Sequence, residues 1–128
     1  VDSRDVDDLR SHGDKDAQLA FDIYIHRIVS YIGAYTAQMG GCDVITFTAG
    51  VGENDASVRE AVCDKLIPFG VKLDKEKNAV RSGDPRVISA PDSSVTIAVI
   101  PTNEELAIAR KVAKLAEKGD AYGNVFGR

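Results

Sequence analysis

A glycine-rich pentapeptide lies between a short apolar run and a stretch with helical periodicity; it comprises Gly50, Val51, Gly52, Glu53 and Asn54. Glycine tolerates positive φ and lets a ligand approach the backbone closely, and the free N–H groups at the start of a helix attract anions. These residues could therefore hold a phosphate or the ribose of a nucleotide. An ordinary structural turn would use the same glycines. The segment lacks the third glycine of the dinucleotide fingerprint and the Lys-Ser/Thr of the P-loop.

A second junction between a predicted strand and a predicted helix is "IPTNEE", residues 100–105. Carboxylates in the first turn of a helix commonly do no more than complement the helix dipole. A glutamate in such a position can also hold Mg²⁺, directly or through water, beside the phosphates of a nucleotide. This segment alone leaves both interpretations open for Glu104 and Glu105.

The remaining polar residues predict no chemistry by themselves. The segment from Asp2 to Asp5, "DSRD", is expected to be a charged loop, either a solvated turn or a place where Arg4 meets a base or ribose. Neither His12 nor His26 belongs to a recognisable catalytic triad. The two cysteines, at positions 42 and 63, lack metal-ligand spacing, and we expect them to be reduced thiols.

The periodicity of apolar residues predicts the elements that would position these groups. A long amphipathic helix is expected over residues 16–39, ended by two glycines. A strand buried on both faces, residues 43–50, should follow, and then the Gly50–Asn54 loop. The next helix should start at Asn54 or Asp55 and reach about Ile67, with a core stripe that consists of Val58, Ala61, Val62 and Leu66.

Beyond this helix, the segments "FGVKLD" and "RVISA" predict short strands separated by the polar "KEKNAVRSGDP". The run "VTIAVIP" predicts another strand, and Asn103 should cap a final helix that reaches about residue 118. Residues 119–128 have no periodicity and are expected to form a flexible tail. Alternating helices and strands indicate an α/β fold with a partly parallel sheet.

Composition narrows the class of protein. The chain has 128 residues, 44% hydrophobic and 28% charged, which suits about one globular domain. Its net charge of -4 argues against a binder of nucleic acid or of a membrane surface, because both need a basic face. No apolar run is long enough for a transmembrane helix. The chain begins with valine and has few strands, so we expect part of a larger protein that works in the cytoplasm.

Five segments in order closely resemble the C-terminal part of bacterial acetate kinases, members of the acetokinase family. The most specific are "FTAGVGEN" and "VIPTNEE"; "DSRDV", "FGVKLDKEKN" and the long helix support them over roughly residues 2–116. The resemblance implies part of the C-terminal lobe of an actin- and sugar-kinase-like (ribonuclease H-like) fold, a mixed sheet with flanking helices. It also implies exchange of a phosphoryl group between ATP and acetate, with Mg²⁺, giving ADP and acetyl phosphate.

The resemblance assigns roles residue by residue. Asp2, Ser3 and Arg4 match a loop that lines the adenosine pocket, with Ser3 at a variable position. The Gly50–Asn54 segment matches a loop that contacts the nucleotide, with Val51 where isoleucine is usual. Glu104 matches the magnesium glutamate. The resemblance also implies a homodimer, to which the stripe Ile25, Ile28, Ile32 and Tyr35 could contribute.

The acetate pocket and the side chains that stabilise the transferring phosphoryl group belong to a part of the family that precedes these residues. We therefore expect no catalytic residue in this chain and no turnover of acetate by it alone. Two alternatives remain. One is a propionate or butyrate kinase, and the other is a binding or assembly module that keeps a nucleotide site without chemistry.

Overall fold

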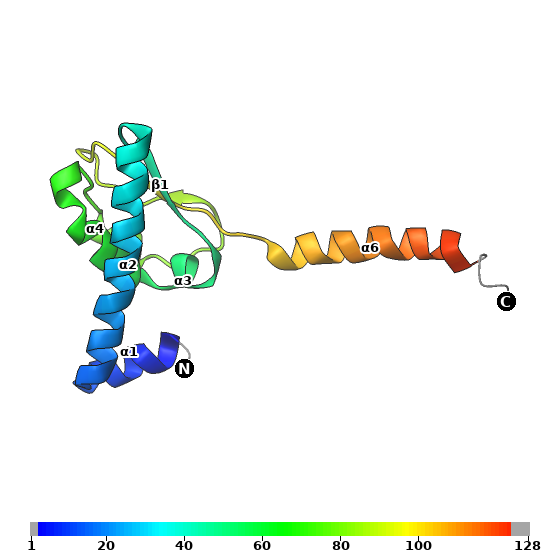
Figure 1. Ribbon diagram of the computed structural model, residues 1–128, viewed down its shortest axis with the longest axis horizontal. Helices are drawn as coiled ribbons and strands as arrows, with labels where there is room; N and C mark the ends of the chain where they lie inside the picture. Colours follow the sequence, from blue (N-terminus) through cyan, green and yellow to red (C-terminus); the bar gives the residue numbers. More distant parts are fainter. Residues whose placement is uncertain (1–2, 124–128) are drawn as a thin grey trace.

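The computed structural model describes residues 3–123. Its sheet has three strands, β1 (Val44–Phe47), β2 (Arg86–Val87) and β3 (Thr96–Val99), in the order β1-β3-β2. Strand β1 runs parallel to β3, from the pair Val44–Thr96 to the pair Phe47–Val99, and β2 is antiparallel to β3. The α/β class with a partly parallel sheet is confirmed. Figure 1 shows α2 and α4 beside the sheet, and α6 extending away from it.

The long helix α2 (Lys15–Met39) agrees with the prediction from sequence. It begins where Asp14 Oδ1 accepts a hydrogen bond from Ala17 N at 2.8 Å. It ends at Gly40, whose φ of 76° is the left-handed conformation that glycine adopts at little cost. Phe21 and Ile25 are buried in one core with Ile45 and Phe47 of β1, and Ile28 and Ile32 pack against the same core.

Helix α4 (Ala56–Lys65) provides the other large contribution to the core. Asp55 caps it, its Oδ1 accepting from Ser57 N at 2.9 Å and Val58 N at 3.0 Å. Of the predicted stripe, Val58, Val62 and Leu66 are buried, and Ala61 is partly buried. Its neighbour Cys63 is buried as well, and burial raises the pKa of this thiol to about 12. Cys42 and Cys63 are both free, as predicted.

The segment after α4 differs from the prediction. "FGVKLD" was predicted as a strand, but a 3₁₀ turn, η1 (Ile67–Phe69), leads into Gly70 at φ 84°, and a single bridge joins Leu73 to Ser89. Pro68 at the start of η1 favours the turn because its φ is already fixed there. The "KEKNAVRSGDP" connector contains a short helix, α5 (Lys75–Ala79), which Asp74 caps.

Two further predictions were wrong. Residues Ser3–Ser11 form a helix, α1, rather than a charged loop. Strand β1 is buried on one face only: Ile45 and Phe47 point to the core, whereas the side chain of Val44 is 55% exposed. Within the described residues nothing covers the second face of β1, so its apolar run does not signify burial on both sides.

The last helix, α6 (Glu104–Gly123), extends away from the body of the molecule (Figure 1). Asn103 caps it as predicted, with Oδ1 accepting from Leu106 N at 3.1 Å. The helix is longer than predicted, because it continues to Gly123; residues 124–128 lie outside the described part, where the flexible tail stays a prediction. Every side chain described in it, from Glu104 to Glu117, is exposed.

Candidate functional site

The glycine-rich segment is helical. Residues Ala49–Asn54 form α3, directly after β1, where a loop was predicted. The backbone of Asp55 closes it by donating to Val51 O at 2.9 Å, and the side chain of Asn54 donates to Gly50 O at 2.8 Å. The glycines would allow positive φ, but within this turn it occurs at Ala49, with φ 60°. Gly50 instead keeps the open side of this turn free of a side chain, whereas Gly52 faces β1.

Gly52 lies close to the strand that precedes it. A Cβ built on Gly52 would lie 3.4 Å from the carbonyl carbon of Phe47, an ordinary contact, whereas a Cβ on Gly50 would meet nothing within 4 Å. A methyl group therefore fits at either position. A branched side chain at Gly52 would press its additional carbons on the buried end of β1.

The far end of α3 is bound to a buried arginine on α4. Arg59, 2% exposed, donates from Nη1 to the carbonyl oxygens of Gly52 and Glu53, both at 2.9 Å. It donates from Nε to Asn78 Oδ1 at 2.7 Å and from Nη2 to Asn78 O at 2.9 Å. Burial, and then the positive charge of Arg86, lower the pKa of Arg59. The guanidinium remains charged because its usual pKa is so high.

Glu53 links the two predicted motifs. Its Oε1 accepts from Thr102 N at 2.7 Å and from Thr102 Oγ1 at 3.0 Å. These bonds, that of the Thr102 backbone first, lower the pKa of Glu53 below its ordinary value. Since this carboxylate is already engaged, Glu53 contributes to the site mainly by joining α3 to the start of α6.

Two adjoining hollows surround these elements. The first hollow, about 1070 Å³, has α3 on one side and residues 79–83 on another, with Arg59 and Asp55 between them. The second hollow, about 520 Å³, lies between α3 and the start of α6 and is lined by Glu104, Glu105 and Thr102. Gly50 and Glu53 line both. The structure thus brings the Gly50–Asn54 segment and Glu104 to one place.

The groups at the second hollow suit magnesium bound together with a nucleotide. Mg²⁺ is commonly held by one or two carboxylates, with water and phosphate oxygens completing the octahedron. Glu104 and Glu105 offer such carboxylates on the exposed start of α6. Among the described residues no group of three or more His, Cys, Asp or Glu side chains could hold a metal by itself. This donor set fits a metal that the phosphates help to bind.

The third predicted segment is described only in part. Asp2 lies outside the described residues; Ser3 and Arg4 begin α1, and their side chains are not described. Farther along α1, Asp7 lines the first hollow. The Asp2–Arg4 contribution to the site remains a prediction.

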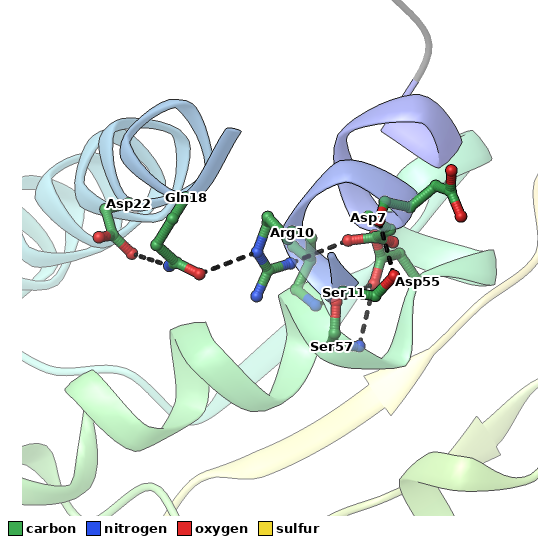
Figure 2. Close-up of polar contacts among 9 residues, drawn as sticks. Asp7, Arg10, Ser11, Gln18, Asp22, Asp55 and Ser57 are labelled. Atoms are coloured by element: carbon green, nitrogen blue, oxygen red, sulfur yellow. Dashed lines mark hydrogen bonds and ion pairs between the residues drawn. The ribbon is translucent and has the colours of Figure 1, made fainter. Parts of the chain in front are cut away.

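Helix α1 is attached to α2 by Arg10. Figure 2 shows this guanidinium between two partners: Nη1 donates to Asp7 Oδ1 at 2.8 Å, and Nε donates to Gln18 Oε1 at 3.2 Å. It also lies over the ring of Phe21, 3.4 Å from the centroid. A cation over an aromatic face is attracted to it, so this contact stabilises a polar segment as a helix. These contacts explain why the segment predicted as a loop is ordered.

Sequence reasoning missed several residues that build the site, above all Arg59, Asn78 and Thr102. For Arg59 a signal was present. It precedes Val62, Cys63 and Leu66 by three, four and seven positions, the spacing of one helix face, so it lies on the buried side of α4. No comparable pattern indicated Asn78 or Thr102.

Comparison with known proteins decides the family. A model of the acetokinase family matches residues 1–110. The chain belongs to the acetokinase family. An acetate kinase of Pseudothermotoga lettingae is 54% identical over 118 residues, which are 92% of this chain and 29% of that protein. The chain thus spans less than a third of the length of the curated relatives it matches.

Solved structures give the same result for the fold. The crystal structure of Porphyromonas gingivalis acetate kinase matches 90% of this chain and 29% of that chain, with 43% identity and a TM-score of 0.76. A propionate kinase from Francisella tularensis matches 84% of this chain and 27% of its own, with 37% identity and a TM-score of 0.73. The predicted resemblance and the actin-like kinase fold, a mixed sheet with flanking helices, are confirmed.

Proposed function

We propose that this chain is the nucleotide-binding part of an acetate kinase, which transfers a phosphoryl group reversibly between ATP and acetate. The observation that supports it most is the shared lining of the two hollows. Gly50 and Glu53 border both, and Glu104 borders the second. The two motifs that resemble the family, far apart in the sequence, therefore face a common space large enough for a nucleotide.

In this proposal each group has a limited task. The helical turn Gly50–Asn54 lies along the nucleotide, with the side-chain-free face of Gly50 allowing close approach. Asp2, Ser3 and Arg4 lie at the adenosine. Glu104 holds Mg²⁺, which supplies positive charge beside the phosphate oxygens when it is bound.

In the reaction, a carboxylate oxygen of acetate forms a bond to the γ-phosphorus of ATP while the bond from that phosphorus to the ADP oxygen breaks. The electron pair of the broken bond stays on ADP, and the products are acetyl phosphate and ADP. Such a transfer depends on positioning and on stabilising charge. We assign no catalytic residue within this chain. We propose that the remainder of the protein supplies the acetate site, and that this chain alone does not catalyse phosphoryl transfer to acetate.

The first test is calorimetric titration of the 128-residue chain with ATP, with and without Mg²⁺. We expect Gly52→Val to abolish binding because its branched side chain presses on Phe47, whereas the matched Gly52→Ala binds, since a methyl group fits. Glu104→Ala should remove only the enhancement by Mg²⁺, and the control Glu117→Ala, exposed farther along α6, should change nothing. If Gly52→Val and Glu104→Ala bind MgATP like the wild type, the site assignment is wrong.

The activity itself requires the rest of an acetate kinase. We would replace the matching 118-residue portion of the Pseudothermotoga lettingae enzyme with this chain, at 54% identity, and measure acetyl phosphate formation. An active chimaera that loses activity with Glu104→Ala supports the proposal. A folded but inactive chimaera that still binds MgATP favours the alternative, a binding or assembly module.

The likeness to a propionate kinase gives a second candidate, propionate as the acyl substrate. The acyl group is chosen by residues outside this chain, so the natural complete protein must be compared on acetate, propionate and butyrate. A kcat/KM higher for propionate or butyrate than for acetate would replace our proposal for the substrate.

We also propose that the protein acts in the cytoplasm as a homodimer. In residues 3–123 no helix is both long and apolar enough to cross a bilayer.

Of the stripe that was predicted to contribute to the dimer, Ile25 is buried, and Ile28 and Ile32 pack on the core. Tyr35 remains 57% exposed and stacks on Tyr31, with ring centroids 6.2 Å apart. Light scattering on the complete protein, with Tyr35→Glu as the disrupting variant, tests the dimer; a monomeric wild type would contradict it.

A further inference from the structure

We propose that Arg59 is the positioning residue of the nucleotide site. Its guanidinium fixes the Gly50–Asn54 turn relative to the opposite wall of the first hollow. The predicted effect of Arg59 on nucleotide affinity rests on the proposed function. The predicted effect of Arg59 on the geometry of α3 can be tested without any nucleotide.

The contacts of Arg59 reach both walls of the first hollow. On one wall, Nη1 binds the carbonyl oxygens of Gly52 and Glu53 in α3. On the other, Nε and Nη2 bind the side chain and the backbone of Asn78, directly before the lining segment 79–83. Asn78 itself is 2% exposed, and its Nδ2 donates to Ala56 O at 2.9 Å, which joins α5 to the start of α4.

Helix α3 cannot hold this geometry alone. It has six residues, two of them glycine, and a helix of that length is unstable in isolation. The last carbonyl groups of a helix have no partner within it. In α3, Val51 O accepts from the Asp55 backbone, and the oxygens of Gly52 and Glu53 accept from Arg59. One side chain thus satisfies two carbonyl oxygens at the C-terminal end of α3, where the helix dipole favours a cation.

The presence of an arginine at this buried position supports the positioning role. A buried charge is costly, and its four hydrogen bonds here go to neutral oxygens rather than to a carboxylate. Core packing alone would favour an apolar residue at this place on the stripe of Val62 and Leu66. A planar guanidinium with donors in fixed directions can span both walls at once, which a single ammonium on a flexible stem cannot do.

The conservative variant Arg59→Lys tests the proposal, because it keeps a positive charge but not the fork. The matched control is Lys75→Met, since Lys75 Nζ pairs with Glu60 Oε1 at 2.6 Å and so also joins α5 to α4, on the surface of the protein. A second variant, Asn78→Ser, keeps Arg59 and its bonds to α3 but removes the amide on the opposite wall. The Asn78→Ser variant tests the proposal if the Arg59→Lys variant does not fold.

The first readout is NMR of the 128-residue chain without nucleotide. We expect Arg59→Lys to move the Cα shifts of residues 50–54 toward random-coil values, while those of α2 and the sheet stay in place and Lys75→Met changes neither. The second readout is kinetic, in the chimaera with the Pseudothermotoga lettingae enzyme. Arg59→Lys should raise KM for MgATP about tenfold and Asn78→Ser about threefold, with KM for acetate within about twofold of the wild type.

The outcomes separate the two proposals. A mere loss of folded protein would lower the apparent kcat and leave both KM values unchanged, which would overturn the positioning role. Unchanged Cα shifts in α3, together with an unchanged KM for MgATP in every variant that folds, would also overturn the positioning role. If the unmodified chain and chimaera bind no ATP while Arg59→Lys still disorders α3, the proposed function fails and the structural role of Arg59 stands.

Discussion

Strands β1 and β3 lie side by side and parallel, and each leads into a helix at the same edge of the sheet. The helix after β1 is α3, whose last carbonyls are bound by the buried Arg59. The helix after β3 is α6, whose described side chains are all exposed and whose approach is fixed by the Thr102–Glu53 contact. The first junction, from β1 to α3, is therefore fixed by contacts within this chain. The second presents the apolar residues Leu106, Ile108, Val112 and Leu115 to solvent.

This comparison shows that the two parts of the site, the Gly50–Asn54 turn and Glu104, are positioned to different degrees by contacts within this chain. The Gly50–Asn54 turn has its geometry prescribed by residues within this chain. Glu104, the first residue of the exposed helix α6, has its backbone placed at one end but no described neighbour to fix its side chain. We therefore expect nucleotide contacts to be more fully formed here than the magnesium site, and four changes test this contrast.

The largest effect should follow from Arg59→Met. This variant leaves the carbonyl oxygens of Gly52 and Glu53, and both oxygens of Asn78, without the donor that binds them in a buried place. We expect the free energy of unfolding to fall by about 3 kcal/mol. The exposed pair Lys75–Glu60 serves as the comparison, and Lys75→Met should cost at most about 1 kcal/mol. Urea titration followed by circular dichroism measures both, and equal losses would contradict the contrast between them.

A smaller effect should follow from Glu53→Gln, and it should depend on pH. The folded pKa of Glu53 is lowered, so its contact with Thr102 stabilises the protein above the ordinary pKa of 4.5 and loses that contribution as pH falls through the folded value. The amide variant keeps an acceptor but no charge. Wild type and variant should therefore differ in thermal midpoint at neutral pH and converge in acid. A constant difference across this range would show that the charge plays no part.

A small gain should follow from Ala49→Gly at the start of α3. Ala49 adopts φ 60°, which costs a residue with a Cβ about 1 kcal/mol, and glycine avoids that cost. Because glycine also loses more backbone freedom on folding, the net increase in the free energy of unfolding should be about 0.5 kcal/mol. Ala61→Gly, inside α4, should instead destabilise the protein. Destabilisation by both would contradict the strained conformation at Ala49.

The smallest effect is expected from removing α6. A chain that ends at Asn103 should unfold with a free energy within about 0.5 kcal/mol of the wild type, because every described side chain of α6 is exposed. Its helical signal at 222 nm should nevertheless fall. A large loss of stability would mean that α6 packs on the body in solution, and would remove the contrast between the two junctions.

The elements that the sequence predicted correctly are those whose signals are local. Asn103 was predicted as a cap, Asp55 was one of two candidates with Asn54, and the core stripe of α4 was read from its spacing, because each depends on residues within one or two turns. The helix at Gly50–Asn54 depends instead on Arg59 and Asn78, which stand later in the chain. Such a contact overrides the tendency of glycine to break helices, and a local pattern does not contain it.

The same reason explains the errors at α1 and β1. Residues Ser3–Ser11 are ordered by Arg10 over Phe21, a contact between two helices that the polar composition of the segment does not show. The run of apolar residues in β1 indicated burial on both faces, yet Val44 is exposed in this chain. Glu104 and the glycine-rich segment were placed at one site from the family resemblance, and the parallel pairing of β1 with β3 is what brings them together.

That parallel pairing also dictates the order of events during synthesis. Phe47, at the end of β1, pairs in register with Val99, so the whole segment between these two residues must leave the ribosome before the two junctions can meet. Until then β1 lacks its hydrogen bonds to β3, and Glu53 of α3 lacks its contact with Thr102. A ligand that contacts both junctions can therefore stabilise the nascent protein only after β3 has emerged and paired with β1.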